Sequence, residues 1–446
     1  MENWQAIAAL MIFVSVIGVI TLEWMHLTIA AMLGALLLVF LNILTLDQAI
    51  GYIAQSHPTL GLFFGVMVMV RAFQPTQVFE YLATQMVLWA KGQGKRLLLG
   101  IVAITTPICA MLPNATTVML LAPLIPPLAE EMGVDFVPLL ILMVFVANSA
   151  GLLTLVGDPA TFIVGSSVNL TFMDYLKTLS LGGAIAVLVV VATLPFLFKK
   201  IWRTKLPSLD NLPHPQINHP RVLLLGSGIV LLVLVFFVIG ETLPVPISPA
   251  TVALLGSVLC LLLVHHSKID SINRILRDVD WSTLLFFMSI FVLIGGLQKT
   301  GVVSSASSVL AVLLGKNIAL GTIALLFSVG LVSSVVPNIP LVVAMVPLLK
   351  GYLVDAGLVG AEILNPESTA QLPPEVMPLF YAMMYGATLG GNGTLVGASA
   401  NIVAAGISEQ HGKSISFRRF LYYGLPTMGL QLFVLALYVS IAFLRG

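Results

Sequence analysis

Long runs of apolar residues alternate with short polar segments along almost the whole chain. The hydrocarbon core of a membrane is about 30 Å thick, and a helix of about 20 apolar residues crosses it. Ten runs have this length, so we predict an all-α integral membrane protein. The ten runs are residues 5–22, 26–45, 58–74, 137–156, 179–200, 222–241, 249–266, 281–297, 378–397 and 424–444.

Two further apolar regions, 97–129 and 319–350, are interrupted near the middle by the pairs Pro113–Asn114 and Pro337–Asn338. The arms on either side are short for membrane spans. We predict that each region is a re-entrant hairpin, because non-helical backbone at membrane depth is tolerated where protein or a water-filled cavity covers it. Two ordinary spans joined by a proline-containing turn are the alternative.

The chain divides into two halves, residues 1–200 and 222–446, joined by a polar linker at 201–221. The sequence from Leu112 aligns with that from Val336 at an offset of 224, and the sequence from Gly151 aligns with that from Gly391 at an offset of 240. We therefore predict two repeats, each with five transmembrane helices and one re-entrant hairpin. An odd number of spans inverts the second repeat relative to the first.

The distribution of positive charge predicts the orientation in the membrane. If the N-terminus lies outside, 15 of the 20 Lys and Arg residues fall in cytoplasmic loops and 5 fall outside. We therefore predict a cytoplasmic linker, a first hairpin that opens to the cytoplasm and a second hairpin that opens outside.

The composition excludes several classes of function. Apolar residues make up 59% of the chain and charged residues 9%, whereas soluble proteins carry roughly 25% charged residues. A net charge of +1 gives no basis for nucleic-acid binding. No phosphate-binding loop and no metalloprotease motif occur. We therefore expect neither an enzyme nor an ATP-driven pump, and no organic cofactor.

Helix-breaking residues gather at four matching places in the halves. Two are the Pro-Asn pairs, and the others are residues 157–161, which begin with Gly157–Asp158–Pro159, and the glycine-rich segment 390–401. Each break leaves backbone carbonyls free, and these suit Na⁺ together with the side-chain oxygens of Asn, Thr and Ser. Each break also leaves backbone N–H groups free, and these suit an anion. We predict two pseudo-symmetric ion sites beside a shared substrate cavity, each built from one hairpin tip and one broken helix. Close helix packing is the alternative explanation for the small residues.

The site residues follow from these breaks. The predicted cation ligands are Asn114, Thr116, Thr117, Asp158, Asn338 and Thr394. The predicted substrate contacts are Asn114, Ala115, Thr161, Asn338, Asn392, Gly393, Ser399 and Asn401. No metal other than Na⁺ is expected.

Asp158 is the carboxylate placed at a predicted mid-membrane break. It can bind Na⁺ or carry a proton, because ionisable residues inside membranes are usually functional. It can also cap the helix that Pro159 opens, and the two roles are compatible. The matching position in the second half is Ala398, so a titrating site is confined to the first half.

The motifs PNATTVMLLAPL, TLVGDPATFIVGSS, DWSTLLFFMSIFVLIGGLQKTG and GNGTLVGASANIVAAGISEQHG together resemble the ArsB/NhaD branch of the ion transporter superfamily. That branch includes arsenite permeases, sodium/proton antiporters and the P protein, and the sodium-coupled dicarboxylate carriers are more distant. The resemblance implies inverted repeats, elevator-type motion, a homodimer and, for this chain, a bacterial inner (plasma) membrane.

In the dicarboxylate carriers a Ser-Asn-Thr motif at each hairpin tip binds sodium and substrate. The resemblance transfers these roles to residues 114–116 and 338–340, but Pro113 and Pro337 replace the leading Ser, and the second tip has no Thr. The Gly-Asp-Pro motif resembles the broken-span motif of the P protein and the NhaD-like members, and this resemblance favours a small inorganic ion. We therefore expect a secondary active transporter coupled to Na⁺ or H⁺, either a Na⁺/H⁺ antiporter or an anion or oxyanion permease. An anion channel of the same fold and a sodium-coupled carboxylate carrier are the alternatives.

Overall fold

The computed structural model describes residues 3–22, 24–205, 216–365 and 371–444. Residues 206–215 of the predicted linker therefore lie outside the described residues. Within the described ranges the regular structure consists of helices, without a β-strand. The prediction of an all-α protein is confirmed.

The first half contains thirteen α-helices among the described residues. They are α1 (Asn3–Thr21), α2 (Leu27–Phe40), α3 (Leu46–Gln55), α4 (His57–Phe73), α5 (Val78–Ala90), α6 (Gly94–Met111), α7 (Asn114–Leu121), α8 (Ile125–Glu131), α9 (Phe136–Ala150), α10 (Pro159–Ser167), α11 (Phe172–Thr178), α12 (Ser180–Leu197) and α13 (Lys199–Arg203). Short 3₁₀ helices lie at η1 (Gln74–Thr76), η2 (Ala122–Leu124) and η3 (Gly151–Leu153).

The second half contains ten α-helices in its described part. They are α14 (Pro220–Ile239), α15 (Pro249–Ser267), α16 (Ile272–Arg277), α17 (Trp281–Lys299), α18 (Val302–Leu314), α19 (Ile318–Ser333), α20 (Asn338–Asp355), α21 (Met377–Gly390), α22 (Ser399–Gln410) and α23 (Phe417–Phe443). Three 3₁₀ helices accompany them, η4 (Gly240–Thr242), η5 (Ala361–Leu364) and η6 (Pro374–Val376).

Ten helices in the described residues are long and apolar enough to cross a membrane, which agrees with the predicted number. The set differs from the prediction in two of its members. Helices α2 and α21 were predicted as spans, but they have only 14 residues each and are not in the set. Helices α6 and α20, which form arms of the predicted hairpins, have 18 residues each and take their place in the set. Helix α21 is short because the glycine-rich segment from Gly390 ends it.

Both Pro-Asn pairs interrupt the helices at the predicted positions. Helix α6 ends before Pro113 and α7 begins at Asn114, while α19 ends before Pro337 and α20 begins at Asn338. The backbone angles of the two prolines nearly coincide, with φ −53° and ψ 140° at the first and φ −52° and ψ 139° at the second. Proline lacks an N–H and disfavours helix in the preceding residue, so each pair ends one helix and starts the next.

Corresponding helices of the two halves begin at the two offsets that the sequence alignment gives. Helices α4, α5, α6 and α7 begin 224 residues before α17, α18, α19 and α20, and α10 begins 240 residues before α22. The halves therefore share one order of helices and breaks. The relative orientation of the repeats in a membrane and the re-entrant path of the hairpins stay predictions.

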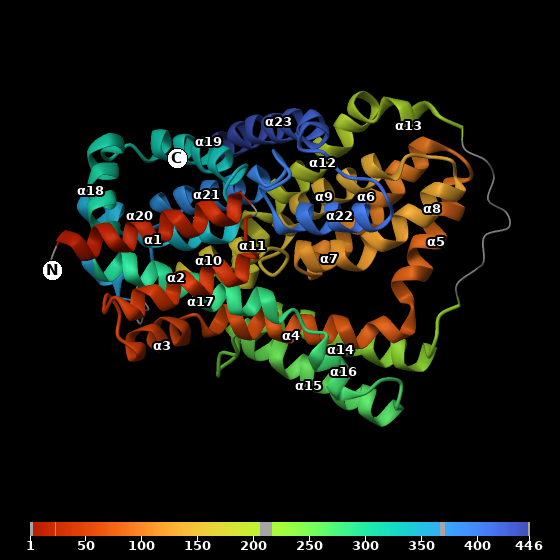
Figure 1. The fold of residues 1–446 in the computed structure, drawn as a ribbon, viewed down its shortest axis with the longest axis horizontal. Coiled ribbons are helices and arrows are strands. Elements are labelled where there is room, and N and C mark those ends of the chain that lie inside the picture. The colour runs from red at the N-terminus through yellow and green to blue at the C-terminus, as the bar shows by residue number, and fades with distance from the viewer. Residues whose placement is uncertain (1–2, 23, 206–215, 366–370, 445–446) are drawn as a thin grey trace.

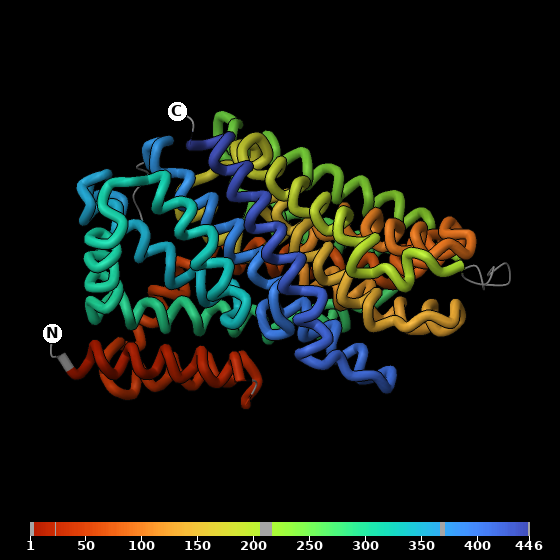
Figure 2. Tube along the Cα trace, turned by 90° about the horizontal axis from the view of Figure 1, so that it is seen from above, coloured from red at the N-terminus to blue at the C-terminus, as the bar shows by residue number. Residues whose placement is uncertain are grey.

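The helices surround a buried centre. Of the residues in the span Phe136–Leu153, which contains α9, 94% are buried. In the spans that contain α1 and α14, only 17% are buried. In Figure 1, α18 lies at one end of the long axis and α8 at the other, with α9, α10 and α21 between them. Figure 2 shows α1, in red, along one edge of the molecule. Exposed Leu, Ile and Val on α1 and α14 form a surface that suits lipid.

Candidate functional site

The broken helices of each half are joined to the hairpin tip of the same half by one threonine. Thr154 Oγ1 donates to the carbonyl of Ala110 at 2.5 Å, near the end of α6. Thr394 Oγ1 donates to the carbonyl of Ser334, just after α19. Each threonine fills one carbonyl that the end of a helix leaves free. The predicted combination of a tip with the broken helix of its own half is therefore present.

The structure also joins each tip to the broken helix of the other half. Helix α7 packs against α22, and α20 packs against α10. Sequence reasoning did not predict this exchange. It places side chains from both halves around each of two buried polar clusters, which differ in their chemistry.

The first cluster, which we call the carboxylate site, consists of Asp158, Thr161, Asn338 and Thr388. Asp158 is completely buried. Its Oδ1 accepts from the backbone N of Ala160 at 2.8 Å. Asn338 Nδ2 lies 3.4 Å from Oδ1 and 3.3 Å from Oδ2 of the same carboxylate. Asp158 is thus both the cap of α10, as one interpretation of the sequence predicts, and a partner of the second hairpin tip.

Two threonines complete the carboxylate site. Thr161 Oγ1 donates to the carbonyl of Asp158 at 2.8 Å. Thr388 Oγ1 is buried and lies close enough to the carboxylate of Asp158 to interact with it. A hydroxyl oxygen is also a ligand that suits Na⁺.

The negative charge of the carboxylate site has no positive side chain beside it. Among the described residues, the ion pairs join other groups, such as Arg71 with Asp270 and Asp278. Burying an isolated carboxylate is strongly unfavourable. A bound cation or a bound proton removes this cost, so the site is suited to hold one or the other.

The second cluster, which we call the amide site, consists of Asn114, Asn148, Ser149, Asn392, Asn401 and Gln431. Asn148 stands at its centre: its Oδ1 accepts from Asn114 Nδ2 at 3.0 Å, and its Nδ2 donates to Asn392 Oδ1 at 3.0 Å and to Asn401 Oδ1 at 3.2 Å. These groups come from the first tip, α9, the second break and α22. The cluster therefore joins the two halves through neutral side chains.

The remaining members of the amide site close the network. Asn392 Nδ2 donates to Gln431 Oε1 at 2.9 Å and to Ser149 Oγ at 3.3 Å. Gln431 Nε2 donates to Ser149 Oγ at 2.8 Å and to the carbonyl of Ala186 at 3.0 Å. Asn401 Nδ2 donates to backbone carbonyls of the break. Nearly every polar group of this site has its partner inside the protein.

Several predicted residues lie at the edges of the two sites. Ala115 and Thr116 are half-buried in the first turn of α7, and Ser399 is half-buried at the start of α22. Thr117 is buried, and its hydroxyl has no hydrogen-bond partner among the described residues. Gly393 lies directly against Ser334 and Met428, so the close-packing explanation applies to it.

Four residues of the two sites were missed in the sequence, namely Asn148, Ser149, Thr388 and Gln431. A signal was present, because polar side chains inside long apolar helices are uncommon and tend to bond across helices. The offset of 240 also pairs Asn148 with Thr388. Applying this offset to every polar residue in the spans identifies both positions.

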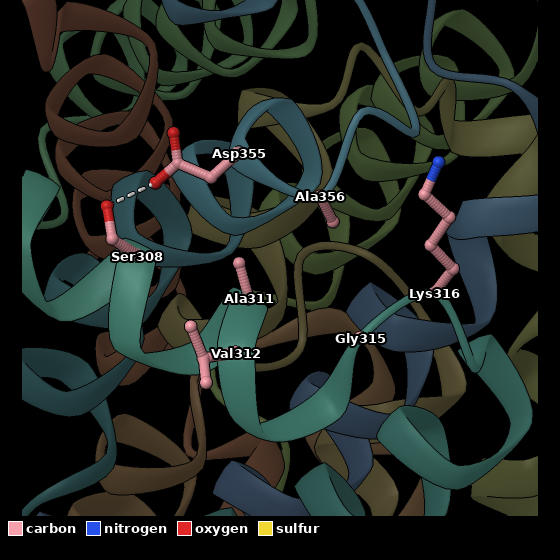
Figure 3. A pocket seen from close by; sticks show the side chains of 7 residues that line it. All are labelled: Ser308, Ala311, Val312, Gly315, Lys316, Asp355 and Ala356. Carbon is pink, nitrogen blue, oxygen red and sulfur yellow. Dashed lines mark hydrogen bonds between the residues drawn. The ribbon is translucent and has the colours of Figure 1, made fainter.

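A hollow at the surface of the described structure lies elsewhere. It has a volume of about 480 Å³ and is lined by residues of α18, the loop that follows it and the end of α20. In Figure 3, Ser308 bonds to Asp355 at one side of this hollow, and the chain of Lys316 extends at the other. It shares no residue with the carboxylate or amide site.

Comparison with known proteins assigns the family. The profile of the family described as citrate transporter matches residues 17–370. The chain belongs to this family. It is therefore a membrane transporter and not an enzyme, which confirms both of these predictions.

The similar proteins agree with this assignment. An uncharacterized transporter of Synechocystis sp. is 68% identical over 438 residues, which cover 98% of each chain. An uncharacterized transporter of Mycobacterium bovis is 31% identical over 443 residues, again 98% of each. The P protein of Sus scrofa is 29% identical over 521 residues, covering 98% of this chain and 59% of the P protein. The similarity to the P protein was predicted, and membership of the ArsB/NhaD branch in particular stays a prediction.

Proposed function

We propose that the chain is a secondary active transporter that couples the movement of a small ion to Na⁺ or H⁺ at the carboxylate site. The single observation that carries this proposal is the complete burial of Asp158 without a positive side chain beside it. Intramembrane carboxylates commonly mark the pathways of ions and protons in transporters.

The ligand set of the carboxylate site favours a small hard cation. Na⁺ is bound by oxygen ligands, and the site offers the carboxylate of Asp158 and the hydroxyl oxygen of Thr388. The side-chain amide of Asn338 lies beside this carboxylate. The same carboxylate accepts a proton where H⁺ is the coupling ion. Na⁺/H⁺ antiport, in which the two ions compete for Asp158, uses this site alone and is the version that we favour.

The proposed transport cycle uses two inverted repeats and elevator-type motion of the parts that carry the sites. The equivalent helix starts of the two halves support a repeated unit. The resemblance to the ArsB/NhaD branch supplies the inverted orientation, the elevator motion and the homodimer, and all three belong to the proposal.

A second candidate is cation-coupled transport of a carboxylate anion. It is favoured by the description of the matching family as citrate transporter. Four helices, α7, α10, α20 and α22, begin at the two sites and direct backbone N–H groups toward them, which suits an anion. In this version Asp158 still binds the coupling cation, and the anion binds beside it.

Flux measurements in proteoliposomes test the proposal. We expect the wild type to move ²²Na⁺ against a pH gradient, or to take up citrate with a dependence on Na⁺ or pH, and we expect Asp158→Asn to lose the coupled flux. Asp47→Asn, an identical change at an exposed position, is the matched control. Unchanged flux and unchanged pH dependence in Asp158→Asn contradict the proposal. Currents too large for stoichiometric exchange identify a channel instead.

A further inference from the structure

The carboxylate and amide sites occupy equivalent places in the two repeats, yet only one of them contains a carboxylate. We infer that the side-chain amide of Asn401 permanently fills the second cation position, so that this transporter couples to a single cation, at Asp158. The inference rests on the proposed function, since it presupposes a cation at the carboxylate site.

The nitrogen of Asn401 lies where a cation is expected. Asn401 Nδ2 donates to the carbonyl of Gly391 at 2.7 Å and to the carbonyl of Thr394 at 2.9 Å. These carbonyls belong to the break between α21 and α22, and free carbonyls at a broken helix are typical cation ligands. Chemistry fixes the orientation of the amide, because two carbonyl oxygens accept from N–H and repel the amide oxygen.

The equivalent residue in the first half is Thr161, whose side chain is shorter and carries no amide. Its hydroxyl donates to the carbonyl of Asp158 at 2.8 Å and lies 3.5 Å from the carbonyl of Leu155. In the described part of the chain, no side chain donates to the carbonyls of Gly151 or Thr154, which correspond to those that Asn401 fills. The two breaks therefore have equivalent backbone segments and differ in whether a side chain donates to these two carbonyls.

The other side-chain oxygens of the amide site already accept hydrogen bonds. Asn148 Oδ1 accepts from Asn114, Asn392 Oδ1 accepts from Asn148, and Gln431 Oε1 accepts from Asn392. A cation entering this site must displace several of these bonds and gains no carboxylate in return. Neutral amides also do not titrate near neutral pH, so the site does not carry a proton.

The position that would hold a second carboxylate is occupied by Ala398. Its backbone, with φ −145° and ψ 145°, is extended like that of Asp158, with φ −139° and ψ 129°. An aspartate at this position can therefore cap α22 as Asp158 caps α10. The backbone for a second cation site is present, and the residues at 398 and 401 keep it closed.

Counting bound ions tests the inference directly. We propose equilibrium dialysis of the purified full-length chain with ²²Na⁺, together with thermal unfolding over a range of NaCl concentrations. We expect one Na⁺ per wild-type chain and none in Asp158→Asn. We expect one additional Na⁺ in Asn401→Asp, because a carboxylate cannot donate to the carbonyls of Gly391 and Thr394 and needs a cation between them. Gln410→Glu, the same type of change at an exposed position of α22, is the control and should bind as the wild type does.

A second variant protects the test against misfolding of Asn401→Asp. The double variant Ala398→Asp with Asn401→Thr gives the second half the residues of the first, and it should also gain one Na⁺. Two Na⁺ in the wild type, or no gain in either variant when both are folded, overturns the inference. No Na⁺ in the wild type but a gain in the variants supports it and identifies H⁺ as the coupling ion. Coupled flux that survives Asp158→Asn contradicts the proposed function and leaves the closed amide site as a separate result.

Discussion

The two buried sites of this protein have the same backbone around different side chains. In both, a Pro-Asn pair starts a hairpin helix and a threonine bonds to the end of the preceding helix, as Thr154 and Thr394 show. The carboxylate site holds a buried acid that forms no ion pair among the described residues, whereas the amide site pairs most of its polar groups internally. The comparison shows that a repeated fold can keep two broken helices and place a carboxylate at one of them.

The most severe test of this comparison moves the carboxylate from one site to the other. The double variant Asp158→Asn with Ala398→Asp keeps one buried acid in an equivalent position. We expect coupled flux at the background level of empty liposomes, because Asn401 still fills the cation position of the amide site. The single variant Ala398→Asp shows whether the new acid is tolerated. Recovery of flux in the double variant means that the two sites are interchangeable and contradicts the comparison.

Removing the centre of the amide network should affect stability and not ion binding. Asn148→Leu leaves the Nδ2 of Asn114 and the Oδ1 atoms of Asn392 and Asn401 without the bonds that they make now. A buried polar group without a partner costs about 1–3 kcal/mol, so we expect the free energy of unfolding to fall by at least this amount. Denaturation in detergent measures the change. A variant with normal stability that no longer responds to cations makes the amide site a binding site instead.

The matched change in the carboxylate site should affect ion binding more than stability. Thr388→Val keeps the shape of the side chain and removes the buried hydroxyl beside Asp158. Without a bound cation, we expect stability to change less than in Asn148→Leu, because fewer buried groups lose a partner. We expect the affinity for the coupling cation to fall about tenfold, which corresponds to ~1.4 kcal/mol. Titration with NaCl or with acid measures it, and unchanged affinity removes Thr388 from the ligand set.

The smallest predicted effect concerns acid sensitivity away from both sites. A hydrogen bond from Arg71 lowers the pKa of Asp278. A lowered pKa contributes stability above the unfolded value of about 3.9, and this is lost only as the pH falls further. Asp278→Asn should therefore leave the pH dependence of unfolding between about pH 5 and pH 8 unchanged. A changed profile in this range assigns the pH response to the surface and not to Asp158.

Local sequence was enough to predict the breaks. Proline at 113 and 337 cannot donate a backbone hydrogen bond, and Asp158 before Pro159 is a strong signal for the start of a helix. These effects depend on neighbouring residues alone, so the positions where α7, α10 and α20 begin agree with the prediction.

The partners at each site were beyond such reasoning. Asn148 bonds to side chains 244 and 253 residues away, and Gln431 bonds to Ser149 at a separation of 282. Helical periodicity does not say which half supplies the neighbour of a buried amide. The sequence therefore predicted two equivalent ion sites, and the hydrogen bonds show how the side chains of the two places differ.

The central claim is that Asp158 binds the coupling cation, and cation-dependent stability tests it most directly. Thermal unfolding of the wild type and of Asp158→Asn is to be followed side by side over a range of pH and of NaCl concentration. A ligand at roughly 100 times its Kd stabilises the folded state by about 2.7 kcal/mol. We expect the wild type to gain stability of this order with Na⁺ or with protons, and Asp158→Asn to lose that response. An equal response in both proteins contradicts the account.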